Sequence, residues 1–112
     1  MNKQPGGPTV FVVEHMPFDY TPAAIYGELR FLEAERLAPH SPNAPETWNN
    51  SVVKRLERGL GPYVPGYDFV IPTGAPTRMM LVGMLLSRKG DKHKILKWDA
   101  RSQRYSEYII IL

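Results

Sequence analysis

The sequence contains no cysteine among its 112 residues. Disulfide bonds and thiolate zinc sites are therefore excluded, and the composition fits a protein of a reducing cytoplasm. Long apolar runs are also missing: the most apolar segment, Met79–Leu86, is much shorter than the roughly 20 residues that a helix needs to cross a bilayer. We therefore expect a cytoplasmic protein that does not associate with a membrane.

The first eight residues lack the apolar core of a signal peptide and include two glycines and two prolines. We expect residues 1–8 to form a flexible lead-in, because chain ends order poorly unless other contacts hold them. A chain of this length favours one domain, which we place at residues 9–112.

Signature motifs of the common enzyme classes are absent. The sequence has no phosphate loop, no dinucleotide-binding Gly-x-Gly-x-x-Gly, no nucleophile elbow and no His-Glu-x-x-His. Gly59 and Gly61 follow a predicted helix, so we interpret them as its end. His15, His40 and His93 have no metal-ligand spacing to one another or to a carboxylate. The sequence therefore predicts neither a metal nor another cofactor, and it favours a non-enzymatic function.

Charge is distributed unevenly along the chain. The net charge is +3, but residues 1–50 carry three basic and six acidic side chains, whereas residues 51–112 carry eleven and five. Such asymmetry can indicate an anionic partner. The alternative is that the lysines protect a solvated edge strand from aggregation.

The clearest pattern lies between Tyr67 and Asp99. Tyr67–Pro72 predicts a strand, which a tight turn joins to an apolar helix ending near Ser87, and Lys94–Asp99 predicts the next strand. A strand, helix and strand of these lengths are typical of a right-handed crossover between parallel neighbours.

The helix in this unit is apolar around nearly its whole circumference, over Met79–Leu86. A surface helix normally keeps a polar face, so we expect another segment or a second copy of the chain to cover its outer side. A homodimer through this helix is one hypothesis. Gly83 is expected to let the helix approach a neighbour closely.

The N-terminal half contains one ambiguous segment. Thr9–Glu14 predicts a central strand, because its apolar residues are contiguous rather than alternating. Thr21 and Pro22 are typical of a helix start. Gly27 either ends this short helix before a strand over Glu28–Leu32 or lies inside a helix that lasts to about Ala38. The strand is the favoured alternative.

Two further elements complete the predicted fold. An amphipathic helix begins near Pro45, with an apolar stripe of Trp48, Val52, Leu56 and Leu60, and Tyr105–Leu112 predicts a last, antiparallel strand. The chain is thus predicted to be an α/β domain of about five strands in a mostly parallel sheet, with an antiparallel C-terminal strand and two to three helices.

A binding edge follows from this fold. Ligands of a parallel sheet lie outside the carboxyl ends of its strands, where Glu14, His15, Thr73, Gly74 and Asp99 would gather. The free N–H groups at the start of the Met-rich helix would face an anion there. An enzyme hypothesis uses His15 as a general base near Asp99.

A nucleic acid or an anionic nucleotide is another candidate ligand. Basic residues between Lys92 and Arg104 lie beside Trp98 and Tyr105, a combination that can contact phosphates and stack bases. Trp98 also shares a strand face with Leu96, which is typical of a core position. The predicted residues for binding a partner or an anion are His15, Thr73, Gly74, Arg78, Lys92, Lys94, Lys97, Arg101 and Arg104.

Four segments, Val12–Ala23, Tyr26–Leu32, Tyr67–Gly74 and Ile95–Asp99, resemble small orphan proteins encoded by tailed bacteriophages. The resemblance implies a βαβ-type α/β domain and supports the strand at Glu28–Leu32. It implies no activity and no functional residues. Small phage proteins of this kind often bind a host protein or a component of a defence system. The resemblance therefore implies a host macromolecule as partner, a role in host takeover or anti-defence, and the host bacterial cytoplasm as location.

Overall fold

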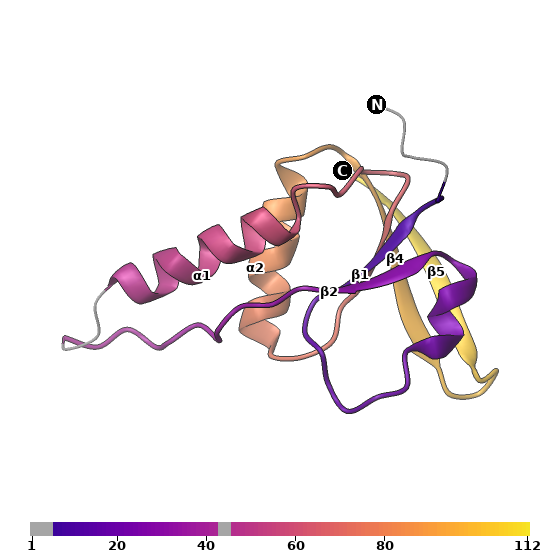
Figure 1. The fold of residues 1–112 in the computed structure, drawn as a ribbon, viewed down its shortest axis with the longest axis horizontal. Helices are drawn as coiled ribbons and strands as arrows, with labels where there is room; N and C mark the ends of the chain where they lie inside the picture. Colours follow the sequence, from indigo (N-terminus) through magenta and orange to yellow (C-terminus); the bar gives the residue numbers. More distant parts are fainter. Residues whose placement is uncertain (1–5, 43–45) are drawn as a thin grey trace.

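A computed structural model of the chain describes residues 6–42 and 46–112. Within these residues the chain forms one five-stranded sheet, two α-helices and a short 3-10 helix (Figure 1). The strands are β1 (Thr9–Val12), β2 (Glu28–Phe31), β3 (Phe69–Ile71), β4 (Lys92–Asp99) and β5 (Arg104–Ile111), and the helices are η1 (Thr21–Ile25), α1 (Glu46–Gly59) and α2 (Pro76–Ser87).

The sheet has the strand order β2-β1-β3-β4-β5. β1 pairs in parallel with β2 and β3, β3 pairs in parallel with β4, and β5 runs antiparallel to β4. The predicted central position of β1, the crossover through α2 and the antiparallel last strand are therefore confirmed. β3 is shorter than the predicted strand, because the N–H groups of Tyr67 and Asp68 donate to Val64 O in a turn.

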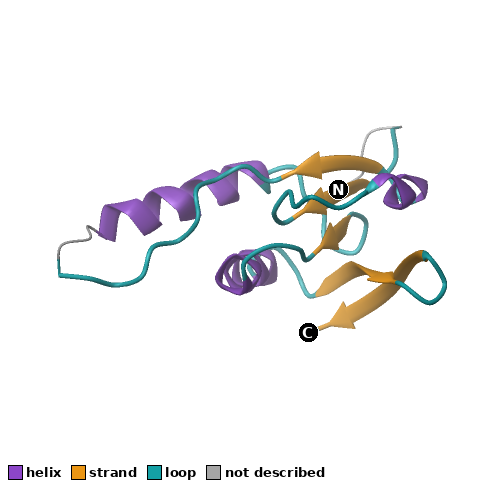
Figure 2. Cartoon of the chain, turned by 90° about the horizontal axis from the view of Figure 1, so that it is seen from below, coloured by secondary structure: helices purple, strands orange, loops and turns teal. Residues whose placement is uncertain are grey.

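Helices cover the two faces of the sheet unequally. Figure 2 shows α1 and α2 on one side of the sheet and the short η1 on the other. Successive side chains of a strand alternate between faces, so Phe11 and Val13 pack beneath α1 and α2, whereas Val10 and Val12 pack with η1. The contiguous apolar run of β1 thus supplies both cores.

The ambiguous segment after Gly27 is a strand. β2 pairs along its length with β1, which confirms the favoured alternative. α1 is described from Glu46, and its predicted start at Pro45 lies outside the described residues. Trp48 departs from the predicted apolar stripe: it is exposed, and its Nε1 donates to Arg36 O at 2.9 Å.

The outer side of α2 is open within the described residues. Met80 and Met84 are 66% and 58% exposed. A Cβ added at Gly83 would meet no atom within 4 Å. The expectation that Gly83 allows a close approach is therefore wrong for the described part of the chain, because the helix turns this position toward open space.

Tyr63 and His93 form a buried hydrogen-bonded pair. His93 Nε2 lies 2.8 Å from Gly90 O, which only accepts, so Nε2 carries the proton and Nδ1 accepts from Tyr63 Oη at 2.6 Å. Burial, together with the charge of Asp68, raises the pKa of Tyr63 to about 12.

This pKa predicts a loss of stability in alkali. The folded protein holds the phenol proton more tightly than the unfolded chain, so the contribution is complete below about pH 10 and is lost as the pH rises through 12. We expect the free energy of unfolding to fall by about 2 kcal/mol over this interval. Urea denaturation at pH 9 to 12 measures it. Tyr63→Phe should start less stable and show a flatter pH profile; an equally steep profile in this variant would contradict the assignment.

Candidate functional site

The connections that leave β1 and β3 run to opposite faces of the sheet, one to η1 and one to α2. Ligands of open α/β sheets bind at such a switch point. Side chains tie the two connections together here: Thr73 Oγ1 donates to Glu14 O at 2.8 Å and lies 3.0 Å from Tyr20 Oη. Tyr20 Oη also accepts from Met16 N at 3.1 Å. These hydrogen bonds hold the two connections together as one surface at this edge of the sheet.

The start of α2 already holds a carboxylate of the chain. Glu14 Oε1 accepts from Ala75 N and Glu14 Oε2 from Arg36 Nε, both at 2.8 Å. Gly74 has φ +108 and lies against Glu14 so closely that a Cβ would overlap Oε1. Burial raises the pKa of Glu14, but the hydrogen bonds from Arg36 and Ala75 and the charge of Arg78 outweigh it, so the pKa is lowered. The carboxylate thus lies where an external anion was predicted.

Arg78 is buried and joins three parts of the fold. Its Nε donates to Val13 O at 2.9 Å, Nη1 to Ala34 O at 2.8 Å and Nη2 to Leu32 O at 2.9 Å. Burial lowers the pKa of Arg78, and the charge of Glu14 opposes that shift. The guanidinium donates to three backbone carbonyls and is buried, so it does not belong to the candidate site.

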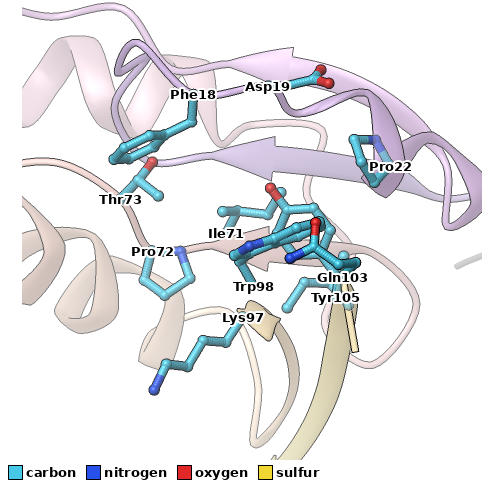
Figure 3. A pocket seen from close by; sticks show the side chains of 11 residues that line it. Phe18, Asp19, Pro22, Ile71, Pro72, Thr73, Lys97, Trp98, Gln103 and Tyr105 are labelled. Carbon is cyan, nitrogen blue, oxygen red and sulfur yellow. The ribbon is translucent and has the colours of Figure 1, made fainter. Parts of the chain in front are cut away.

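The open part of this edge is an apolar hollow of about 700 Å³ on the η1 face. β4 continues into the β4–β5 hairpin instead of a helix, so no layer covers this face beyond η1 in the described residues. Figure 3 shows Trp98 and Tyr105 side by side on its floor, with Phe18 at its rim. The two floor rings meet edge to face at 5.2 Å. The lining residues are Phe18, Asp19, Pro22, Ile71, Pro72, Thr73, Leu96, Lys97, Trp98, Gln103 and Tyr105.

Few polar groups line the hollow. Asp19 Oδ1 accepts from the hydroxyl and the backbone N–H of Thr21, and these hydrogen bonds lower the pKa of Asp19. Gln103 has φ 56, and its Nε2 donates to Ala100 O at 2.7 Å. Burial, with smaller effects of Tyr20 and Asp19, raises the pKa of Tyr105. An apolar cavity with a few fixed polar groups suits an aromatic or aliphatic group that carries a polar end.

The family model described as phage Pam3 gp32-like protein matches residues 8–111. The chain belongs to this family. No curated protein and no solved structure matches it. The predicted resemblance to bacteriophage proteins is thereby confirmed.

None of the described helices is long and apolar enough to span a bilayer. Residues 6–42 and 46–112 also contain no group of three or more His, Cys, Asp or Glu side chains placed to hold a metal ion.

The predicted basic residues do not lie on one face. Lys94 and Lys97 are an odd number of positions apart on β4, so their side chains point to opposite faces. Lys94 Nζ lies 4.6 Å from the centre of the Phe69 ring. Lys97 and Arg101, in contrast, line a second hollow of about 370 Å³ at the end of the hairpin. Lys92 begins β4 opposite Ile111, and Arg104 begins β5 opposite Asp99.

His15 and Asp99 have separate partners. The His15 ring packs against Phe31 at 4.2 Å and Tyr20 at 5.8 Å. Asp99 Oδ1 accepts from Arg101 N at 3.0 Å, and the hydrogen bonds from Arg101 and Ser102 lower the pKa of Asp99. No hydrogen bond joins His15 to Asp99 among the described residues.

Sequence reasoning missed Phe18, Asp19 and Gln103 as site residues. Their position depends on the uncovered η1 face, which is visible in the sequence only as two consecutive strands after α2. A strand pair without a helix between them leaves one sheet face without its usual cover. That signal pointed to the hollow without indicating which side chains line it.

Proposed function

We propose that this phage protein is a non-enzymatic accessory protein that binds a host protein and takes an apolar side chain of it into the hollow beside Trp98. The observation that carries the proposal is Trp98 itself, which is 38% exposed on the floor of a cavity at the carboxyl edge of the sheet. Tryptophan and tyrosine in such pockets dominate the energy of protein interfaces. A role in host takeover or anti-defence in the host cytoplasm is consistent with membership of a phage family.

The surroundings of the hollow support a protein partner. Phe18 is exposed at its rim, and Asp19 and Gln103 place polar groups beside it. An apolar centre with a polar rim is the usual anatomy of a protein interface. The described residues offer this hollow no nucleophile with an adjacent base, which favours binding over catalysis.

The two tryptophans of the chain provide a matched test. Trp98 lies in the hollow, whereas Trp48 is similarly exposed (46%) on α1. We expect Trp98→Ala to lower the amount of a specific host protein captured from lysate roughly 30-fold, as for a hot-spot residue. Trp48→Ala should capture as much as the wild type. Retention of the partner by Trp98→Ala, or the absence of a specific partner for the wild type, would refute the proposal.

A nucleic acid or an anionic nucleotide is the alternative ligand. The favouring observation is that Lys97, Trp98 and Arg101 line the second hollow together, which combines positive charge with a stacking surface. Oligonucleotide binding should weaken steeply with salt and should weaken further after charge reversal of Lys94, Lys97 and Arg101. Binding that is absent or independent of salt would exclude this alternative.

A further inference from the structure

The outer edge of β5 is unusually apolar. Its last residues and Leu112 are exposed: Tyr108 49%, Ile109 57%, Ile110 39%, Ile111 74% and Leu112 68%. From Tyr105 to Leu112 there is no lysine and no proline. Lysine and proline are the residues that normally prevent an edge strand from pairing with another chain. The edge lies at the end of the sheet away from β2, next to the C label in Figure 2.

The backbone of this edge is available for pairing. Leu112 N donates to Asp91 O at 2.8 Å, which makes these two residues a hydrogen-bonded pair. The backbone groups of an antiparallel strand point alternately toward and away from its neighbour. Those of Tyr105, Glu107, Ile109 and Ile111 therefore point outward, where no strand of the described residues pairs with them.

We propose that β5 pairs antiparallel with β5 of a second copy, about a two-fold axis that passes through Tyr108. A two-fold axis normal to the sheet pairs residues that share a face, and outward groups must meet outward groups. An axis at Tyr108 pairs Glu107 with Ile109 of the second copy and Tyr105 with its Ile111. About eight backbone hydrogen bonds form along the whole strand. The two sheets become one continuous sheet.

The apolar area agrees with a dimer of this kind. The exposed parts of the five side chains amount to roughly 500 Å² for each chain, and Met80 and Met84 extend this to roughly 700 Å². One partner of a standard interface contributes about 800 Å². A smaller apolar hollow of about 190 Å³ joins the two parts, since Gly83, Ile110 and Leu112 all line it. The exposed area of Met80 and Met84 alone is too small for an interface. The larger exposed area of β5 therefore forms the centre of the proposed interface.

Analytical ultracentrifugation of the full chain tests the proposed pairing of β5 with β5 of a second copy. The wild type should sediment at twice the chain mass of 12.7 kDa. Ile109→Lys combined with Ile111→Lys should give a monomer, because lysine on an edge opposes strand pairing. Met80→Lys combined with Met84→Lys, on similarly exposed positions at the periphery of this surface, should weaken the dimer only slightly and still sediment as a dimer. A wild type that is monomeric at all concentrations, or dissociation only by the α2 variant, would overturn the proposal.

A cross-link tests the register without relying on the lysine variants. The chain has no cysteine, so Tyr108→Cys introduces one thiol on the two-fold axis, opposite its own copy. Mild oxidation should yield a covalent dimer, because directly opposed Cβ atoms are within reach of a disulfide. Ile110→Cys, two residues along the same face, should cross-link at least 10-fold less. Equal cross-linking of the two variants would refute this register. Trp98→Ala should remain dimeric, so failure of this proposal is separable from failure of host binding.

Discussion

Arg78→Met is expected to lower the free energy of unfolding by at least about 3 kcal/mol, because each buried carbonyl left without a donor costs about 1–3 kcal/mol. The guanidinium donates to carbonyls at the end of β1, after β2 and at Ala34, each within 2.9 Å. Methionine fills a similar volume but donates nothing. The loss is large beside the total stability of about 5–15 kcal/mol typical of a small domain.

Urea denaturation followed by tryptophan fluorescence measures this loss. Arg88→Met is the matched control: Arg88 is exposed at the other end of α2, and its 3.7 Å ion pair with Glu57 is exposed too. Such pairs contribute about 0–1 kcal/mol. Arg78→Lys should recover only part of the stability, since one ammonium cannot replace the planar fork that serves three carbonyls. If Arg78→Met and Arg88→Met unfold at the same urea concentration, Arg78 does not hold the fold as inferred.

The role of Arg78 could not be predicted from the sequence, although most of the fold could. The predicted strands and the crossover depend on apolar residues close together in the chain, and these elements are confirmed. The partners of Arg78 lie 44 to 65 residues away. No local pattern indicates that an arginine in the first turn of a helix turns inward. The sequence therefore suggested that Arg78 binds an anion, whereas in the structure Arg78 donates hydrogen bonds to three backbone carbonyls.

The prediction of a basic binding surface was limited in a similar way. Counting charges between Lys92 and Arg104 treats neighbours in sequence as neighbours in space. A strand separates them by face, so Lys94 lies over Phe69 whereas Lys97 belongs to the opposite side and the hairpin end. The predicted turn at Thr73 and Gly74 leads into α2, which begins at Pro76. The backbone N–H of Ala75 donates a hydrogen bond to Glu14, and only the folded chain brings these two residues close together.

Gly27→Ala is expected to lower the free energy of unfolding by about 3 kcal/mol, the upper part of the range for overpacking. A Cβ at Gly27 would overlap Pro8 O and lie 2.8 Å from Pro8 C. Both are backbone atoms, and Pro8 O also accepts from Glu28 N at 3.3 Å where β1 and β2 begin to pair. Neither side can yield without separating the two strands. Sequence reasoning assigned Gly27 to the end of a helix, but the close approach of Pro8 is what requires glycine there.

Gly83→Ala is the matched control and should have the opposite effect. Position 83 is exposed inside α2, and its Cβ would meet nothing within 4 Å. Alanine there removes the conformational entropy of a helical glycine, which should raise the free energy of unfolding by about 0.5–1 kcal/mol. Thermal and urea unfolding of both variants measure the difference. The close approach that the sequence suggested at Gly83 is found at Gly27 instead, because the space around a Cβ depends on tertiary contacts. A Gly27→Ala variant as stable as Gly83→Ala would show that Pro8 and β2 do not approach as described.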